Sequence, residues 1–334
     1  MVTMADVAKR AGVTKQTVSN VVRGRSVVSP ATKARVEAAI AELGYTPNLV
    51  ARSLATGTTM TVGFIVPTIV HPFYSEVVEE VETLLEEHSY HLLLATTRGD
   101  GERARRHLAS LSSRSVDALL VAGDFDLSDG VPLLDDHGLP VVLCAWEIDP
   151  PDTLPVVTVD YEQAGYLAGR HLRDLGHRRL TVIADLPAHR IRVSGAVRAF
   201  AEDGLDVPEG SVFPAPRATP ESGYDAAMLA LSAADRPTAV FASTDAIALG
   251  VMEAVRRHGL RVPEDVSVVG IDDIPQASHA HPPLTTVALP KRRMAQEATG
   301  LLLGALAENR LVPPSLTLIT PEVLVRASSA PPAG

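Results

Sequence analysis

The chain has 334 residues, of which 46% are hydrophobic, and its formal net charge is -10. This length is enough for two or three domains with buried cores, and the composition excludes a disordered chain. No apolar run approaches the roughly 18 residues of a membrane-spanning helix, and no apolar stretch of a signal peptide opens the chain, so we expect a cytoplasmic protein. The single cysteine, Cys144, lies in the apolar run PVVLCAW, which predicts a buried thiol and excludes a disulfide framework.

Charge is divided unevenly along the chain. The first 58 residues hold eight basic and three acidic side chains, a net charge of +5, which leaves -15 for the remainder. A small basic head on a large acidic body is typical of a head that contacts a polyanion and a body that avoids it. Because charge runs are usually solvated surfaces, this pattern needs support from local structure.

Three short helices are predicted in the basic head. Thr3, Thr14 and Ser29 are placed to cap them, with Pro30 at the first position of the third helix. Gly12 and Gly44 are expected to end the first and third helices. Apolar residues at spacings of three and four predict one small core, made of Val7, Ala8, Ala11, Val18, Val21, Val22, Val36, Ile40 and Leu43.

The first two helices are joined by a tight turn, as in a helix-turn-helix motif, whose second helix fits the major groove of DNA. The polar face of that second helix carries Lys15, Gln16, Thr17, Ser19 and Asn20. Amide side chains can bond to adenine, lysine to guanine, and hydroxyl groups to phosphates. The pattern alone is equally consistent with a small helical bundle that has a polar surface.

The segment TPNLVARSLATG, residues 46 to 57, follows the head. Asn48 is placed to cap one or two apolar helical turns, which are too short to be stable alone in water. Such a segment is expected to fold against a partner, and Leu54 is suited to open a base step in the minor groove. A plain linker would contain more Ser, Gly and Pro.

Apolar strand-like runs alternate with helical patterns in the remainder of the chain. The runs begin near residues 62, 91, 117, 140, 156, 180, 238 and 267. This alternation predicts βαβ units and parallel sheets, whose ligands bind beyond the carboxyl ends of the strands and between domains. Candidate ligand contacts near those ends are Phe73, Tyr74, Trp146, Asp160, Thr244, Asp245 and Asp272.

The runs TMADVAKRAGVTKQTVSNVVRG, VSPATKARVEAAIAELGYTPNLVARSLATG, VPEDVSVVGIDD and PPLTTV resemble, in this order, the lactose and galactose repressor family of bacterial transcription regulators. The resemblance implies a helix-turn-helix domain over 1–46, a hinge helix over 47–58 and an effector-binding, dimerising core over 59–334. It further implies a periplasmic-binding-protein-like core of two doubly wound parallel-sheet subdomains. Their expected bounds are 60–160 plus 290–320 for the N-subdomain and 161–289 plus 321–328 for the C-subdomain.

By position, the resemblance also implies the DNA contacts. Base contacts fall to Lys15, Gln16 and Asn20, and phosphate contacts to Thr3, Thr14, Thr17, Ser19, Ser29 and Thr32. Leu54 matches the intercalating leucine of the hinge, and Asn48 and Arg52 complete the predicted DNA-binding set. Asn20 stands where many members have Arg or His, so no operator sequence is implied.

For the effector, the resemblance places aromatic contacts at Phe73 and Tyr74. Arg190 and Arg192 fall in the family's RxRxxG stretch, and Asp272 in its VVGxD stretch. Carboxylate and guanidinium groups bond to hydroxyls and aromatic faces pack on ring carbons, which suits a sugar. Alanine stands at 218, where members often have an aromatic residue, and at 145, where some have an acidic residue, and both changes remove contacts and enlarge the expected cavity. Either the effector is bulkier than a simple monosaccharide or nucleobase, or other residues supply its contacts.

We therefore predict a homodimeric, effector-controlled repressor that binds a pseudo-palindromic operator, with no cofactor or metal and no catalytic residue. Two alternatives remain, a cytoplasmic α/β enzyme and a solute-binding protein with a fused helical head. The turn RGDGERA at 98 to 104 resembles a dinucleotide fingerprint but follows the second strand rather than the first, so a polar turn is the better interpretation. A solute-binding protein would need an export signal and no basic head.

Overall fold

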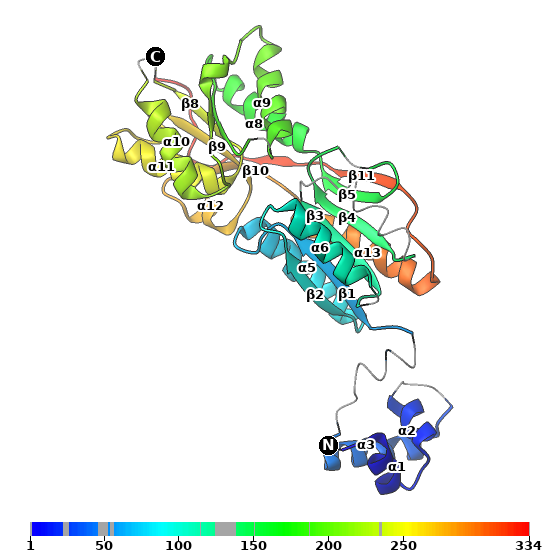
Figure 1. Ribbon diagram of the computed structural model, residues 1–334. Helices are drawn as coiled ribbons and strands as arrows, with labels where there is room; N and C mark the ends of the chain where they lie inside the picture. Colours follow the sequence, from blue (N-terminus) through cyan, green and yellow to red (C-terminus); the bar gives the residue numbers. More distant parts are fainter. Residues whose placement is uncertain are drawn as a thin grey trace. The chain divides into compact units, whose positions relative to one another are not determined.

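The computed structural model describes residues 2–22, 27–45, 53, 57–113, 115–123, 138–149, 151–186, 188–233 and 236–333. Its internal contacts divide the chain into two compact units, Met1–Met60 and Thr61–Gly334. Figure 1 colours the first unit dark blue and the second from light blue to red. The predicted hinge contacts Asn48, Arg52 and Leu54 lie outside the described residues.

The smaller unit contains three helices, α1 (Met4–Ala11), α2 (Lys15–Val22) and α3 (Pro30–Leu43). Thr3 caps α1 through a reciprocal pair of bonds with Asp6, since the Asp6 amide donates to Thr3 Oγ1 and the Thr3 amide donates to Asp6 Oδ2 at 2.8 Å. Gly12 ends α1 and Gly44 ends α3, both with positive φ, as the sequence predicts. The three helices bury one shared cluster that includes Val7, Val18 and Val36, so the polar face of α2 is left for other contacts.

Sheet A of the larger unit is wholly parallel, with strand order β11-β5-β4-β3-β1-β2. Its strands are β1 (Thr61–Val66), β2 (His91–Thr96), β3 (Ala118–Gly123), β4 (Val141–Trp146), β5 (Pro155–Val159) and β11 (Ser315–Ile319). Its helices are α5 (Pro72–Glu87), α6 (Gly101–Ser112) and α13 (Lys291–Glu308). Phe64 packs with the cluster under α5 and α13, whereas its neighbour Ile65 packs with α6. Helices therefore cover both faces of the sheet, which explains why β1 is apolar without alternation.

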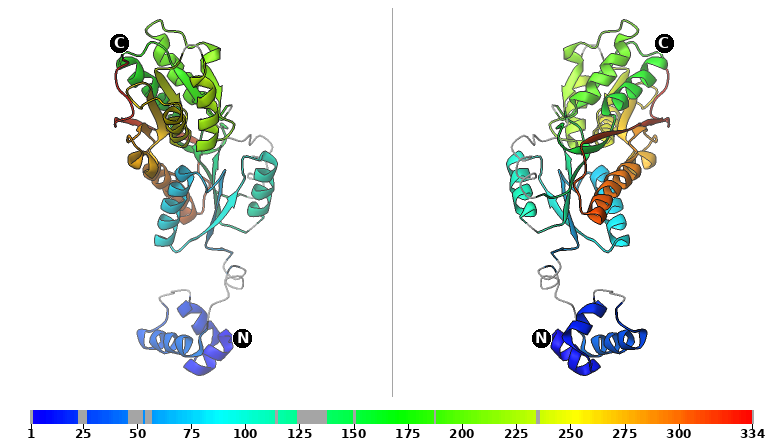
Figure 2. Two further views of the ribbon diagram at one scale, coloured as in Figure 1. Left: turned by 90° about the vertical axis from the view of Figure 1, so that its left-hand side faces the viewer. Right: turned by 90° about the vertical axis from the view of Figure 1, so that its right-hand side faces the viewer.

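Sheet B has the strand order β12-β10-β9-β8-β6-β7. Its strands are β6 (Thr181–Ala184), β7 (Val212–Pro214), β8 (Ala239–Ala242), β9 (Ser267–Asp272), β10 (Thr285–Ala288) and β12 (Glu322–Leu324). Its helical elements are α8 (Tyr161–Asp174), α9 (Arg190–Ala201), η1 (Glu209–Ser211), α10 (Pro220–Leu231), α11 (Asp245–Arg257) and α12 (Pro275–His279). Figure 2 shows helices on both sides of this sheet as well.

The two sheets are each assembled from separate stretches of the chain. The chain passes from sheet A to sheet B after β5, returns after β10 to form α13 and β11, and crosses again into β12. The carboxyl ends of β1 and β2 and those of β6, β8 and β9 consequently lie around one cavity.

The fold confirms the predicted three-helix head followed by two doubly wound α/β sheets, with one correction. Sheet B is not wholly parallel, because β12 at its edge runs antiparallel to β10. All eight predicted runs contain a strand, whereas β7, β10, β11 and β12 were not predicted. Cys144 is fully buried in β4, and burial raises the pKa of its thiol to about 12.

Tight glycine contacts hold helix pairs together in sheet B. A Cβ atom built on Gly165 of α8 would overlap the backbone carbonyl of Arg192 in α9, and one on Gly195 would overlap the carbonyl of Glu162. Glycine at these positions lets α8 and α9 approach closely, which sets the position of Arg192.

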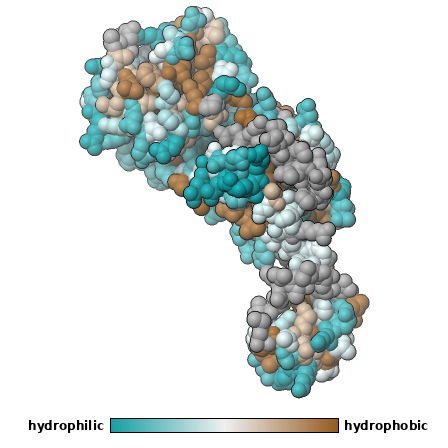
Figure 3. All heavy atoms as spheres, in the orientation of Figure 1, coloured by the Kyte–Doolittle hydropathy of each residue, from teal (hydrophilic) through white to brown (hydrophobic). Residues whose placement is uncertain are grey.

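The surface drawn in Figure 3 mixes hydrophilic residues with separate hydrophobic ones. The most exposed large hydrophobic side chains include Val70, which is 88% exposed, and Leu229, which is 69% exposed. Within the described part of the chain, no helix is long and apolar enough to cross a membrane.

Candidate DNA-binding surface and effector cavity

Most of the DNA-binding candidates of the head lie at the start and on the polar face of α2. Gln16 donates to Asn20 across one helical turn, with 3.2 Å between Nε2 and Oδ1, and the hydroxyls of Thr14 and Thr17 bond at 2.9 Å. Lys15 and Gln16 are exposed, whereas Asn20 is half-buried. Ser19 is half-buried in the middle of α2. The remaining candidates with described positions lie at the starts of α1 and α3 and are exposed or half-buried, namely Thr3, Ser29 and Thr32. The face thus offers a paired amide donor and acceptor beside a lysine.

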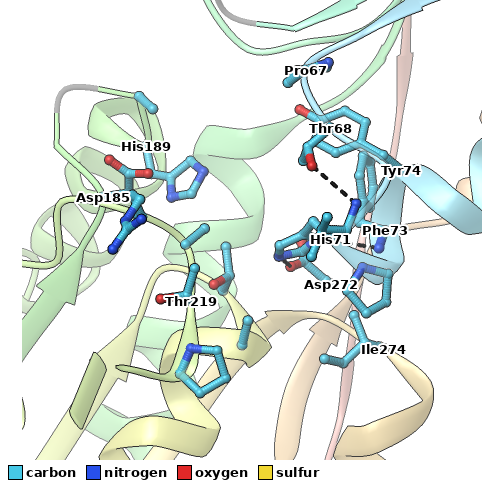
Figure 4. Close-up of a pocket in the computed structure, with 18 of the residues that line it drawn as sticks. Pro67, Thr68, His71, Phe73, Tyr74, Asp185, His189, Thr219, Asp272 and Ile274 are labelled. Atoms are coloured by element: carbon cyan, nitrogen blue, oxygen red, sulfur yellow. Dashed lines mark hydrogen bonds and ion pairs between the residues drawn. The ribbon is translucent and has the colours of Figure 1, made fainter. Parts of the chain in front are cut away.

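The larger unit contains a cavity of about 580 Å³ between the strand ends of the two sheets. Sheet A contributes the turn from Pro67 to Tyr74 and the turn after β2. Sheet B contributes the segments after β6, β7, β8 and β9. Figure 4 shows His71 and Tyr74 on one side of the cavity and His189 and Thr219 on the other. This volume is within the range of small-molecule sites.

Arg192 connects the two sides of the cavity through buried ion pairs. Its Nε lies 2.6 Å from Glu147 Oε1 and its Nη2 lies 2.7 Å from Glu147 Oε2. Its Nη1 donates to the Ser243 carbonyl at 2.8 Å and reaches Asp272 Oδ1 at 3.4 Å. Burial alone would lower the pKa of Arg192, but the charges of Glu147 and Asp272 outweigh burial and raise it. The guanidinium is therefore charged and held in place.

Asp272 and His71 face each other inside the cavity without a direct hydrogen bond. The distance from His71 Nε2 to Asp272 Oδ2 is 3.7 Å, and neither atom has a hydrogen-bond partner among the described residues. His71 Nδ1 accepts a bond from the Phe73 amide at 3.3 Å, which leaves the proton of the neutral ring on Nε2. Burial lowers the pKa of His71, and the negative charge of Asp272 offsets only part of this effect. The cavity thus offers one hydrogen-bond donor, His71 Nε2, and one acceptor, Asp272 Oδ2, to a ligand.

His189 lies across the cavity at the start of α9. Its Nδ1 is 2.9 Å from the hydroxyl of Ser243. Burial, together with the charges of Arg192 and His71, lowers the pKa of His189 well below 6.5. The ring is therefore neutral at pH 7 and can serve as a polar contact.

Five of the nine predicted effector residues line the cavity, namely Phe73, Tyr74, Arg192, Thr244 and Asp272. Thr244 also caps α11, since its hydroxyl accepts from the Ile247 amide at 3.2 Å. The other four predicted residues are not among those that line it, so their contact with an effector stays a prediction.

Those four residues have other places in the fold. Trp146 is buried with the cluster under α6, and Asp160 caps α8 by accepting from the Gln163 amide at 2.8 Å. Arg190 is exposed in the first turn of α9. Asp245 is buried beneath the cavity, where it accepts bonds from the Thr286 hydroxyl at 2.5 Å and from the Ile274 amide at 3.0 Å. Burial and the nearby charge of Asp272 raise the pKa of Asp245 well above 3.8.

Several residues of the site were not predicted. The cavity is also lined by Thr68, His71, Arg98, Asp185, His189, Arg217, Thr219 and Gln276, while Glu147 lies behind Arg192. Glu147 could have been found from the sequence. The acidic residue that the resemblance places at 145 is missing, and an acidic residue occurs two positions later. Ala145 has a φ of 53°, and the pairing of β3 with β4 is irregular at this end.

Comparison with known proteins places this architecture in a family. Residues 3–48 match the model of bacterial regulatory proteins of the lacI family, and residues 169–329 match a periplasmic binding protein-like domain. The transcriptional repressor PurR of Mannheimia succiniciproducens is 36% identical over 332 residues, which cover 98% of each chain.

Solved structures of transcription regulators have the same overall fold as this chain. The lac repressor dimer bound to operator and the anti-inducer ONPF has a TM-score of 0.87 at 28% identity, covering 98% of this chain and 99% of that one. The complex of the transcriptional regulator CelR with cellobiose has a TM-score of 0.73 at 33% identity, covering 98% and 100%. A helix-turn-helix head and an effector cavity between two α/β sheets define a DNA-binding transcriptional repressor controlled by a small molecule. The chain belongs to the lacI family of bacterial regulatory proteins.

Proposed function

We propose that the effector is a polyol, most simply a sugar, which bonds to Asp272 and His71 at the floor of the cavity. The observation that carries this proposal is the pair of buried atoms, Asp272 Oδ2 and His71 Nε2, which are 3.7 Å apart and have no hydrogen-bond partner among the described residues. A ligand hydroxyl can donate to the carboxylate and accept from the imidazole at once. Buried polar atoms left without partners are costly, so such a ligand removes a penalty.

The proposed DNA contacts are those on and around α2. Gln16 and Asn20 form a bonded amide pair that suits adenine, and Lys15 beside them suits guanine. The hydroxyls of the head suit phosphate contacts, and Leu54 of the segment 47–58 suits insertion into the minor groove. A symmetric dimer gives one head to each half-site of a pseudo-palindromic operator.

Effector and DNA are coupled through the two sheets of the core. Because the cavity takes side chains from both sheets, a bound effector favours one relative arrangement of the sheets over others. The coupling is reciprocal, so an effector that weakens DNA binding is itself bound more weakly by the DNA complex. Induction and co-repression both satisfy this relation.

The proposal includes a cytoplasmic location and no catalytic activity. It is supported by the relatives, which are named transcriptional repressors. The alternative of an α/β enzyme lacks a comparable observation.

The test is selection of bound sites from a random-sequence DNA pool by the full chain at two salt concentrations. A recovered pseudo-palindrome supports the proposal, and failure to recover any sequence with or without added sugars contradicts it. Gln16→Ala should lower specific binding by about 1 to 3 kcal/mol and leave non-specific binding unchanged. Glu37→Gln, in the exposed part of α3, is the control and should change neither.

A further inference from the structure

Two arginines from different sheets line the same cavity. Arg98 lies in the turn between β2 and α6, and Arg217 lies in the segment between β7 and α10. Both side chains are exposed. Among the described residues neither guanidinium has a short hydrogen bond or ion pair, although the charge of Arg217 helps to lower the pKa of Glu221 in the first turn of α10. The neighbouring carboxylate of Asp100 is already used, since it caps α6 by accepting from the Arg103 amide at 3.1 Å.

The other cations of this region are paired. Arg192 is held by Glu147 and Asp272. Lys291 lies 3.0 Å from Glu76 and donates to the carbonyl of Asp273 at 2.8 Å. Arg98 and Arg217 have no such short ion pair, and both line the cavity. The exposed carboxylate of Glu221 offsets the charge of Arg217 only in part, so both guanidinium groups can still bind a ligand.

The backbone fixes both arginines at the cavity. Arg98 has a φ of 58°, which is uncommon for a residue with a side chain, and its amide donates to the Pro67 carbonyl at 2.8 Å. The Arg217 carbonyl accepts from the amide of Thr219 at 2.8 Å, and Thr219 then caps α10. Each guanidinium therefore extends from a fixed turn next to a helix N-terminus, where the helix dipole also favours an anion.

From this arrangement we infer that the effector carries an anionic group, a phosphate or a carboxylate, which Arg98 and Arg217 bind together. Guanidinium groups bind either anion through paired hydrogen bonds. The inference rests on the proposed function, in which the polyol part of the same molecule reaches His71 and Asp272. Because the two arginines come from different sheets, the anion bridges the sheets and stabilises the closed cavity. An effector with both parts would also use the volume left by alanine at 218.

The experiment measures thermal unfolding of the full chain with inorganic phosphate, sodium acetate or sodium chloride at one ionic strength. We expect phosphate or acetate to raise the unfolding temperature of the wild type above its value in chloride, and the anion with the larger effect identifies the group. Arg98→Ala and Arg217→Ala should each weaken that anion's apparent affinity at least tenfold. Arg106→Ala on α6 and Arg236→Ala before β8 are matched controls, since both side chains are exposed and neither lines the cavity.

Two outcomes would overturn the inference. One is a wild type that responds to phosphate and acetate as it does to chloride. The other is an anion effect of equal size in Arg98→Ala and Arg217→Ala, which would place the anion on the basic head or elsewhere. Neither outcome affects the proposed function, which is tested by operator selection without these anions. An operator recovered without an anion effect rejects this inference alone.

Discussion

Glu147 and Arg192 form a bidentate ion pair that is almost completely buried, with exposed side-chain fractions of 8% and 5%. Glu147 follows the last strand residue of β4 in sheet A, and Arg192 belongs to α9 of sheet B. The pair therefore joins the two sheets at the cavity. Tyr161 adds to it, with its ring centroid 4.7 Å from the Arg192 guanidinium carbon.

Removing the charge of Glu147 should destabilise the larger unit strongly. In Glu147→Gln the Arg192 guanidinium stays buried with its main counter-charge lost, which typically costs about 3 to 5 kcal/mol. The control is Glu162→Gln, whose 3.2 Å pair with Arg198 is about half exposed and should contribute no more than about 1 kcal/mol. Urea unfolding measures both, and similar losses in the two variants would disprove the importance of the buried pair.

Much of the fold was predictable because most strands are buried on both faces. All residues of β9 are buried, and in β1 all but the first are buried, so the apolar run itself marks each strand. In β11 the pattern is mostly exposed, and β7 and β12 have three residues each, so they offer no run to detect. Antiparallel pairing of β12 depends on where the chain crosses between sheets, which local sequence does not encode.

The site was predictable only in part, for a geometric reason. Thr244 and Asp245 are consecutive, yet the start of α11 directs one to the cavity and the other into the core beneath it. Glu147 reaches Arg192 beyond the irregular end of β4, near the positive φ of Ala145. His71 and His189 lie at turns that no periodicity marks. Strand ends can therefore be identified from sequence, but the direction of each side chain there cannot.

The neutral state of His189 should make stability fall in acid. Its pKa is lowered in the folded protein, so below about pH 6.5 the unfolded chain binds a proton that the folded chain does not. Stability from this group is therefore present above pH 6.5 and is lost as the pH falls. His189→Asn should lose about 1 kcal/mol less than the wild type between pH 6.5 and 5.5.

Urea unfolding at the two pH values gives this difference. His71, His171 and His177 have lowered pKa values too, so the variant should keep part of the wild-type slope. His91→Asn, at the exposed start of β2, is the control and should follow the wild type. A slope for His189→Asn that matches the wild type would show that folding does not lower the pKa of this histidine.

The close approach of α8 and α9 should not tolerate a methyl group. Gly165→Ala would place Cβ against the carbonyl of Arg192, so the helices must separate, at about 1 to 3 kcal/mol. Gly300→Ala in α13 is the control, because its Cβ would meet no heavy atom within 4 Å. That substitution should stabilise the helix by about 0.5 to 1 kcal/mol. Thermal unfolding distinguishes the two, and a stabilising Gly165→Ala would contradict the packing of these helices.

Asp245 should behave as a protonated, structural residue. Burial raises its pKa, so above pH 3.8 the unfolded chain releases a proton that the folded chain retains, and stability from this group falls as the pH rises. Asp245→Asn keeps a neutral side chain of the same shape, so it should cost less than about 1.5 kcal/mol at pH 7 and reduce the decline in stability between pH 5 and 7.

Asp245→Ala removes the acceptor for Thr286 and Ile274, which should cost about 1 to 3 kcal/mol for each buried donor left unpaired. Unfolding at pH 5 and 7 measures both variants. If Asp245→Asn were as harmful as Asp245→Ala, the folded protein would require the ionised carboxylate, and the protonated state of Asp245 would be disproved.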